Sequence, residues 1–285
     1  MTTAGTMRVA AIAIAAAVFE CGAVEVRPAA FHEAKFRARV VKGPTLEEYP
    51  QLEEMVPLLA SHFNNTKVRF ASVVWGFRES KGGKSIPRPH LAASPTILFH
   101  REWRDYAIRF WTPENASWFD LSASRGSGVE IDGLSVSEVA PGDALNANPR
   151  FDAADELVPG WQLTGASQLK KDGSGRNYVL AEEGSIASDL FAVEPGSQVE
   201  VTLRGVPPRF ALKTTRLSAT VYFFAAFADA ASDKKLRANQ SAMKVSVSGR
   251  GRENSYVYTV PEGKRWARFM VSGGSVYECS AKVKE

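Results

Sequence analysis

A short motif that occurs twice constrains the architecture of this chain more than any other feature of its sequence. In FWTPENASW (110–118) and in VPEGKRW (260–266), a Pro-Glu pair precedes a tryptophan, with three residues in between. The two copies are separated by 148 positions at the proline, the glutamate and the tryptophan. This spacing is the length of a whole domain, so the sequence predicts one structural unit that is present twice.

The likeness between the two halves extends beyond this motif. VEIDGLSVSE (129–138) resembles VYECSAKVKE (276–285), and VRPAAFHEAKFRARVVKG (26–43) resembles VEPGSQVEVTLRG (193–205). Each copy therefore ends in the same order of elements, namely a strand, a proline-led turn, a second strand, a turn rich in Gly and Ser, and a last strand.

Hydrophobic residues alternate with polar ones along most of the chain, which is the pattern of half-buried strands. The alternating segments are 35–41, 67–77, 106–110, 199–206, 217–227 and 243–249. One segment, 45–59, has a possible helix cap, but Pro50 and Pro57 restrict it to a helical turn or two within a loop. The sequence predicts an all-β fold.

The two copies meet at APGDALNANP (140–149), which contains turn-forming residues and no apolar alternation. A chain of 285 residues is long enough for two domains of ordinary size. We therefore expect one β-sandwich module at 24–140, shortened at its start, and a second at 141–285.

The first 23 residues have the pattern of a cleaved signal peptide. A short segment ending in Arg8 precedes the apolar run VAAIAIAAAVF, and small residues follow in CGA (21–23). The alternative, a lipoprotein anchored through Cys21, is disfavoured by Glu20. Cleavage after Ala23 would leave Cys279 as the only cysteine, so we expect a secreted protein without an intrachain disulfide.

The charge distribution bears on the partners of the chain. The net charge is +4, but Lys and Arg are interleaved with nearly as many Asp and Glu, which argues against nucleic-acid binding. An acidic polysaccharide remains compatible with this charge. The apolar run of eleven residues near the N-terminus is too short for a membrane span.

Three segments resemble the galactose-binding-like β-sandwich modules, many of which bind carbohydrate as non-catalytic parts of glycan-degrading enzymes. NPRFDAADELVPGWQL (148–163) is similar to their opening, VEPGSQVEVTLRG (193–205) to their next strand pair, and YTVPEGKRWARFMV (258–271) to their late hairpin. The resemblance covers all of the second copy and about the last two-thirds of the first. It implies two tandem jelly-roll domains and a carbohydrate or glycan partner.

The resemblance also bears on calcium. Many relatives hold a structural calcium ion beside an Asp of the last strand and a Glu of the opening motif. The second copy has Cys279 and Asp152 at these positions, and Asp132 fits the pattern in the first copy. Asp132 and Asp152 are therefore the weak candidates for a calcium site.

The sequence contains no catalytic motif that we could place. It lacks a G-x-S-x-G elbow and an H-E-x-x-H pair, and its four histidines stand apart from one another. Paired carboxylates could still act on a glycoside, and Glu47, Glu48, Glu53 and Glu54 form the densest group. The solvated face of a loop or short helix is the better explanation of that group, so we expect no enzymatic activity.

Tryptophan residues near the repeated turns are the candidate ligand-binding groups. Alternation directs Tyr106, Ile108 and Phe110 inward, and the residues expected to lie on the outer face around one hairpin turn are Arg109, Trp111, Trp118 and Asp120. The same count directs Trp266 and Arg268 outward in the second copy. Flat rings beside charged hydrogen-bonding groups suit a sugar, which has one apolar face and a polar edge.

Two functions remain open from the sequence. The first is a secreted, non-catalytic protein that binds a polysaccharide or glycan through the outward tryptophans. The alternative is a structural or protein-interaction module of a cell-envelope or extracellular assembly, in which the same tryptophans seal a loop or pack one domain against the other.

Overall fold

The computed structural model describes most of the two repeated units. The described residues are 22–43, 45, 47–48, 72–87, 96–97, 100–123, 128–152, 158–165, 167–182, 184–208, 216–231, 241–248 and 252–284. The signal segment 1–21 and most of the expected helical turn at 45–59 lie outside them. Ala23, the last residue of the expected signal peptide, lies in the first strand.

In the described residues, the first unit contains seven strands, which form two sheets. They are β1 (Ala23–Glu25), β2 (Phe31–Lys42), β3 (Ser72–Arg78), β4 (Thr96–Ile97), β5 (Arg104–Trp111), β6 (Trp118–Ala123) and β7 (Gly128–Glu138). The strands pair in a four-stranded sheet of order β1-β6-β3-β4 and a three-stranded sheet of order β5-β2-β7. The buried side chains between the two sheets form one core.

The second unit is larger and also consists of two sheets. Its first strands are β8 (Trp161–Gly165), β9 (Gln168–Lys171), β10 (Asn177–Leu180), β11 (Gly184–Ser188), β12 (Phe191–Ala192) and β13 (Gln198–Val206). Then follow β14 (Arg216–Phe224), the 3-10 helix η1 (Phe227–Ala231), β15 (Ala242–Ser248), β16 (Glu253–Thr259), β17 (Trp266–Ser272) and β18 (Ser275–Val283).

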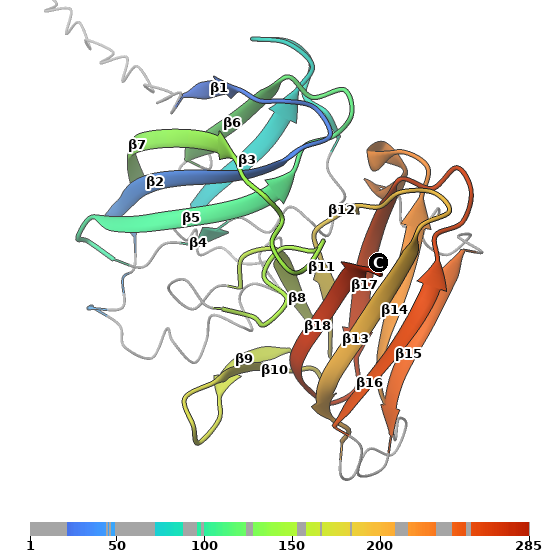
Figure 1. Ribbon diagram of the computed structural model, residues 1–285. Helices are drawn as coiled ribbons and strands as arrows, with labels where there is room; N and C mark the ends of the chain where they lie inside the picture. Colours follow the sequence, from blue (N-terminus) through green and yellow to red (C-terminus); the bar gives the residue numbers. More distant parts are fainter. Residues whose placement is uncertain are drawn as a thin grey trace, which may run out of the picture.

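These strands form a five-stranded sheet of order β16-β13-β18-β10-β9 and a six-stranded sheet of order β15-β14-β17-β11-β8, in which β12 also pairs with β17. In the described residues, β1–β7 pair only with one another, as do β8–β18. Figure 1 shows the two sandwiches as separate bodies, one coloured blue to green and one yellow-green to red. The expected all-β fold of two tandem jelly-roll sandwiches is confirmed.

The internal repeat is visible in the backbone. Strand β2 lies between β5 and β7, and its counterpart β13 lies between β16 and β18. Four hydrogen bonds of the first unit recur in the second at equivalent positions. In the first unit they join Thr112 N to Ala30 O, Ala116 N to Pro113 O, Ser117 N to Arg78 O, and Val26 N to Ser117 O. In the second unit, in the same order, they join Val260 N to Ser197 O, Lys264 N to Pro261 O, Arg265 N to Phe224 O, and Val193 N to Arg265 O.

Alternation explains which side of each strand is buried. Tyr106, Ile108 and Phe110 of β5 point into the first core, as expected, and Phe119 and Leu121 of β6 face them. In the second unit, Val199, Val201 and Leu203 of β13 do the same. The residues between them lie on the outer faces of the sheets, where a binding site could form.

No helix in the described part of the chain is long and apolar enough to cross a membrane.

Candidate functional site

The residues expected to surround one hairpin turn lie on two opposite faces of the first sandwich. Strand β5 belongs to the three-stranded sheet and β6 to the four-stranded sheet, so the turn between them is an arch from one sheet to the other. Arg109 and Trp111 therefore lie on one outer face, and Trp118 and Asp120 on the other. The expectation of a hairpin is wrong here, because alternation along two strands does not reveal whether they pair.

In the second copy, the expected exposure of Trp266 and Arg268 is wrong. The side chains point away from the core of their own sandwich, but Trp266 is only 2% exposed and Arg268 is completely buried. The indole N–H of Trp266 donates to Glu114 Oε2 of the first unit at 2.9 Å. Another domain, and not solvent, covers Trp266.

The apolar core of the first unit extends onto the surface of the second. Five buried residues of the second unit belong to the same cluster as the core of the first, namely Leu190, Phe224, Phe227, Ala230 and Trp266. Phe227 contacts the ring of Phe77 at 6.1 Å and that of Trp266 at 5.2 Å, both edge to face. We call these five residues the docking cluster. They fix one unit on the other by the same burial that stabilises each core.

The side chain of Trp111 also makes its contacts at the junction between the units. Its indole N–H donates to the carbonyl oxygen of Leu145 at 2.8 Å, and its ring lies 5.3 Å from that of Phe31. The connecting segment is held on its other side by Asn146, whose side chain bonds to Cys279 O at 3.0 Å and to Ala281 N at 2.9 Å. Trp111 therefore anchors the segment between the two units.

Beside this segment lies a cavity of about 490 Å³. The outer face of the three-stranded sheet forms one wall, and the outer face of β18 in the five-stranded sheet forms another. The lining residues are Phe31, Glu33, Ala107, Arg109, 141–144, 146–150, Asp152, Pro159, Glu278, Ser280 and Lys282. We call it the junction cavity, because both units and the segment between them are needed to form it.

Charged groups of both signs face the junction cavity. Arg109 Nε donates to Glu33 Oε1 at 2.9 Å, and the ammonium group of Lys35 lies 2.9 Å from Glu33 Oε2. The hydrogen bonds from Lys35 and Arg109 lower the pKa of the Glu33 carboxyl below its usual value. On the opposite wall, Arg150 Nε lies 3.5 Å from Glu278 Oε2. Glu33 is therefore ionised at neutral pH and holds Arg109 at the rim of the cavity.

The two calcium candidates lie in different units. Asp132 is exposed on β7 and lies 3.8 Å from the guanidinium of Arg37. Asp152 lines the junction cavity, and its backbone N–H donates to Asn148 Oδ1 at 2.7 Å. Cys279 is completely buried in the core of the second unit. Within the described residues, no three His, Cys, Asp or Glu side chains gather as a metal site would require, and a calcium ion stays a prediction.

The sequence analysis missed two aromatic residues on the outer face of the five-stranded sheet. Tyr178 of β10 and Tyr277 of β18 stack at 5.2 Å, and the guanidinium of Arg176 lies 4.4 Å from the centre of the Tyr277 ring. Their chain neighbours Val179 and Val276 are buried in the core, so alternation directs both tyrosines to the outer face of the sheet. Only the pairing of β10 with β18, which are far apart in sequence, brings them together.

Comparison with known proteins gives similarity of fold only. No family model and no curated protein matches the sequence. The chain is similar to the N-terminal tandem domain of two CBM22 modules from Xyn10C of Paenibacillus barcinonensis, with 10% identity, a TM-score of 0.33, and coverage of 92% of this chain and 82% of that one.

Two further solved structures are similar to about half of the chain. One is TmCBM61, solved in complex with β-1,4-galactotriose, with 14% identity, a TM-score of 0.30, and coverage of 50% of this chain and 99% of that one. The other is the enzymatically active domain of tailspike protein 4 of bacteriophage CBA120, with 15% identity, a TM-score of 0.34, and coverage of 51% and 22%. The pairing of the strands into two sandwiches agrees with the expected resemblance to carbohydrate-binding β-sandwich modules, and these solved structures, with TM-scores of 0.30 to 0.34, add no argument to it.

Proposed function

We propose that this chain is a secreted, non-catalytic protein that binds carbohydrate in the junction cavity. One observation carries the proposal, namely a cavity of about 490 Å³ between two sandwiches, lined by carboxylates and guanidinium groups. Small-molecule sites occupy clefts of roughly 300–1,000 Å³ and form preferentially at domain interfaces. The cavity therefore has the size and the location of a ligand site.

The polar groups of the cavity favour a neutral ligand rich in hydroxyl groups. The side chains of Glu33, Asp143, Asp152 and Glu278 accept hydrogen bonds, and those of Arg109, Arg150 and Lys282 donate them. Each sugar hydroxyl can do both, and charge-assisted bonds are the stronger ones. Because Glu33 and Glu278 already compensate two of the cations, no excess positive charge is available to select an acidic sugar.

The carboxylates of the chain favour binding over hydrolysis. A glycosidase needs one carboxyl group whose pKa is raised so that it can donate a proton. Glu33, the carboxylate held most firmly in the cavity, has its pKa lowered by Lys35 and Arg109. In the group singled out from the sequence, Glu47 lies 2.8 Å from His100 and Glu48 lies 2.8 Å from Arg101, while Glu53 and Glu54 fall outside the described residues.

A direct test is isothermal titration of the protein with neutral oligosaccharides from cellulose, xylan, mannan and β-galactan. We expect saturable binding of one class, and a loss of at least tenfold in affinity for Arg109→Leu. The matched control is Arg204→Leu, because Arg204 makes a similar pair with Glu253 at 2.8 Å on the surface, away from the cavity. Equal affinities for the two variants would contradict the proposed site. The release of reducing ends from any of these glycans would contradict a non-catalytic role.

The docking cluster supports a second candidate, a structural or protein-interaction role in an extracellular or envelope assembly. Aromatic groups such as Trp266 and Phe227 could bind a ligand, but here they hold one unit against the other. A rigid pair of sandwiches suits a spacer. Failure to bind any glycan, together with specific capture of an envelope protein by the intact chain, would favour this role.

A further inference from the structure

A second cluster of polar and aromatic side chains lies on the outer face of the four-stranded sheet, away from the junction cavity. Trp118 of β6 is partly exposed, and the ammonium group of Lys81 lies 5.6 Å from the centre of its ring. Beside the ring, the guanidinium of Arg78 donates to Asp120 and, at 3.2 Å, to the carbonyl oxygen of Gly83. Among the described residues, the indole N–H of Trp118 donates no hydrogen bond.

The internal repeat supplies a control for this cluster inside the same molecule. Trp118 is equivalent to Trp266, since the separation of 148 positions and the matched backbone hydrogen bonds align them. Opposite Trp118 stand Glu25 of β1 and Arg78 of β3. Opposite Trp266 stand Ala192 of β12 and Phe224 of β14. Three positions further along the chain stand Lys81 and Phe227, and each contacts its tryptophan ring.

The two copies therefore place a tryptophan in opposite surroundings. Phe224 and Phe227 accompany the ring that the other unit covers, and Arg78 and Lys81 accompany the ring that solvent reaches. Docking explains the presence of Trp266, but it does not explain Trp118, which belongs to neither apolar core. Trp118 is only partly buried, so burial explains less of its presence than it does for Trp266, and a role in binding accounts better for the part of the ring that solvent reaches.

The sheet beside Trp118 has space for a small ligand. Along the next row of the sheet, Asp120 stands beside Gly76 of β3, which has no side chain. The result is a shelf with an aromatic wall, an acceptor and a donor. The apolar face of a pyranose can stack on the indole while its hydroxyl groups bond to Asp120 and Arg78.

We propose that Trp118, Arg78 and Asp120 form a second carbohydrate site, which binds one residue of a neutral glycan independently of the junction cavity. Asp120 compensates the charge of Arg78, so the pair recognises hydroxyl groups and not an acidic substituent. The ammonium group of Lys81 covers the face of the Trp118 ring, and the sugar has to displace it in order to stack there. Removal of Lys81 should then tighten binding at this site by about two- to fivefold, the equivalent of an exposed cation–π contact.

The test follows the indole N–H resonances of the full chain by NMR during titration with neutral oligosaccharides from cellulose, xylan, mannan and β-galactan. Trp118→Leu assigns the Trp118 resonance by its disappearance. We expect this resonance to shift saturably with one glycan class, while that of Trp103, which lies 5.1 and 4.9 Å from the guanidinium groups of Arg37 and Arg39, stays in place.

Variants separate this site from the first one. Arg109→Leu should leave the response of Trp118 intact, and Trp118→Leu should leave binding in the junction cavity intact. Lys81→Ala should tighten the response, and weaker binding in that variant would overturn the assignment of a neutral ligand. No shift of the Trp118 resonance with any of the glycans would overturn the second site, whether or not the junction cavity binds.

Discussion

Trp266 donates its indole N–H to Glu114 at 2.9 Å, so that the tryptophan of the second repeated motif is held by the glutamate of the first. The two copies of one motif thus have complementary uses. The Pro-Glu turn of the first unit is the part that docks, and the tryptophan of the second unit belongs to the surface that receives it.

The hydrogen bond between Glu114 and Trp266 should contribute measurably to stability. We expect Glu114→Ala to lower the free energy of unfolding by about 1 kcal/mol, since it leaves a partly buried N–H without its acceptor. Urea denaturation followed by circular dichroism would measure it. The control is Glu262→Ala at the equivalent exposed turn, where no such bond exists among the described residues. Equal losses in the two variants would show that the bond is without effect.

Phe227 should decide whether the units remain docked. Phe227→Lys copies the residue found at the equivalent position of the first unit and places a charge in the docking cluster, at a cost of about 3 kcal/mol or more. We expect the units to separate while each stays folded. Small-angle X-ray scattering would then show a larger radius of gyration, with an unchanged far-ultraviolet circular dichroism spectrum.

The matched control for this change is Ala228→Lys, which places the same side chain at the neighbouring exposed residue of η1. That variant should keep the wild-type radius. If Phe227→Lys also kept it, the docking cluster would not be what holds the units together.

Ala29 and Gly196 occupy equivalent turn positions with φ angles of 51° and 78°. A residue with a side chain is strained in this left-handed region by roughly 1–2 kcal/mol, which glycine avoids at some cost in chain entropy. Ala29→Gly should therefore stabilise the protein by up to about 1 kcal/mol, and Gly196→Ala should destabilise it by about 1 kcal/mol. Thermal unfolding of the two variants would test this pair, and shifts of the same sign would contradict it.

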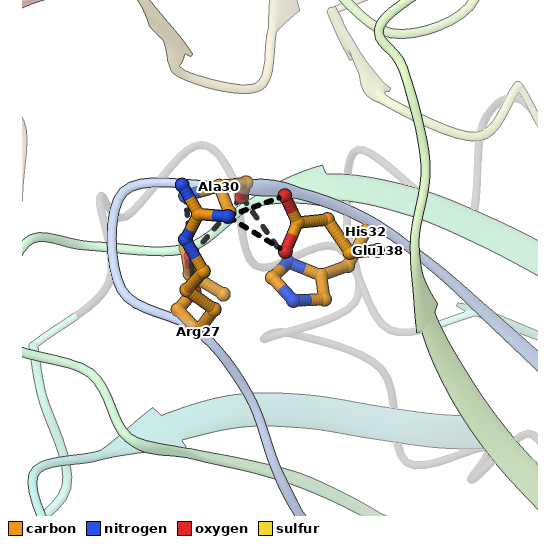
Figure 2. Close-up of polar contacts among 5 residues, drawn as sticks. Arg27, Ala30, His32 and Glu138 are labelled. Carbon is orange, nitrogen blue, oxygen red and sulfur yellow. Dashed lines mark hydrogen bonds and ion pairs between the residues drawn. The ribbon is translucent and has the colours of Figure 1, made fainter.

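His32 should make the first unit sensitive to acid. Its ring is 3% exposed, stacks on Phe110 at 5.9 Å, and lies next to the ion pair of Arg27 and Glu138, with Nδ1 3.2 Å from Ala30 O (Figure 2). Burial lowers the pKa of this imidazole below its ordinary value of 6.5. A pKa lowered by folding gives stability that is present above the ordinary value and is lost as the pH falls through the lowered one.

We therefore expect the urea concentration at the midpoint of unfolding to decrease as the pH is lowered from about 7.5 to about 5. The decrease should be smaller in His32→Leu. The variant does not leave Ala30 O without a partner, since Thr112 bonds to it through both its backbone N–H and its hydroxyl group. Phe36→Leu, which changes a buried ring of the same strand that carries no titratable group, should retain the slope of the wild type. An unchanged slope in His32→Leu would exclude His32 as the acid-sensitive group.

How much of the candidate site could be foreseen differs from residue to residue. Arg109 was foreseen on an outer face and lines the junction cavity. Trp118 and Asp120 were foreseen outside the core, where they are, but on the opposite face from Arg109. Tyr178 and Tyr277 could not be foreseen as a pair, because nothing local to either strand states that β10 and β18 are neighbours.

The order of the residues is enough to predict that the chain is built of strands, that one unit occurs twice, and which side of β5 and β6 faces a core. These properties depend on local periodicity and on self-similarity, both of which are written in the order of the residues. Two features follow from the three-dimensional packing alone: the repeated turn joins two sheets, and Trp266 is covered while Trp118 stays partly exposed. Alternation separates the inside of a sandwich from its outside, but whether that outside meets water or another domain depends on contacts between residues far apart in the chain.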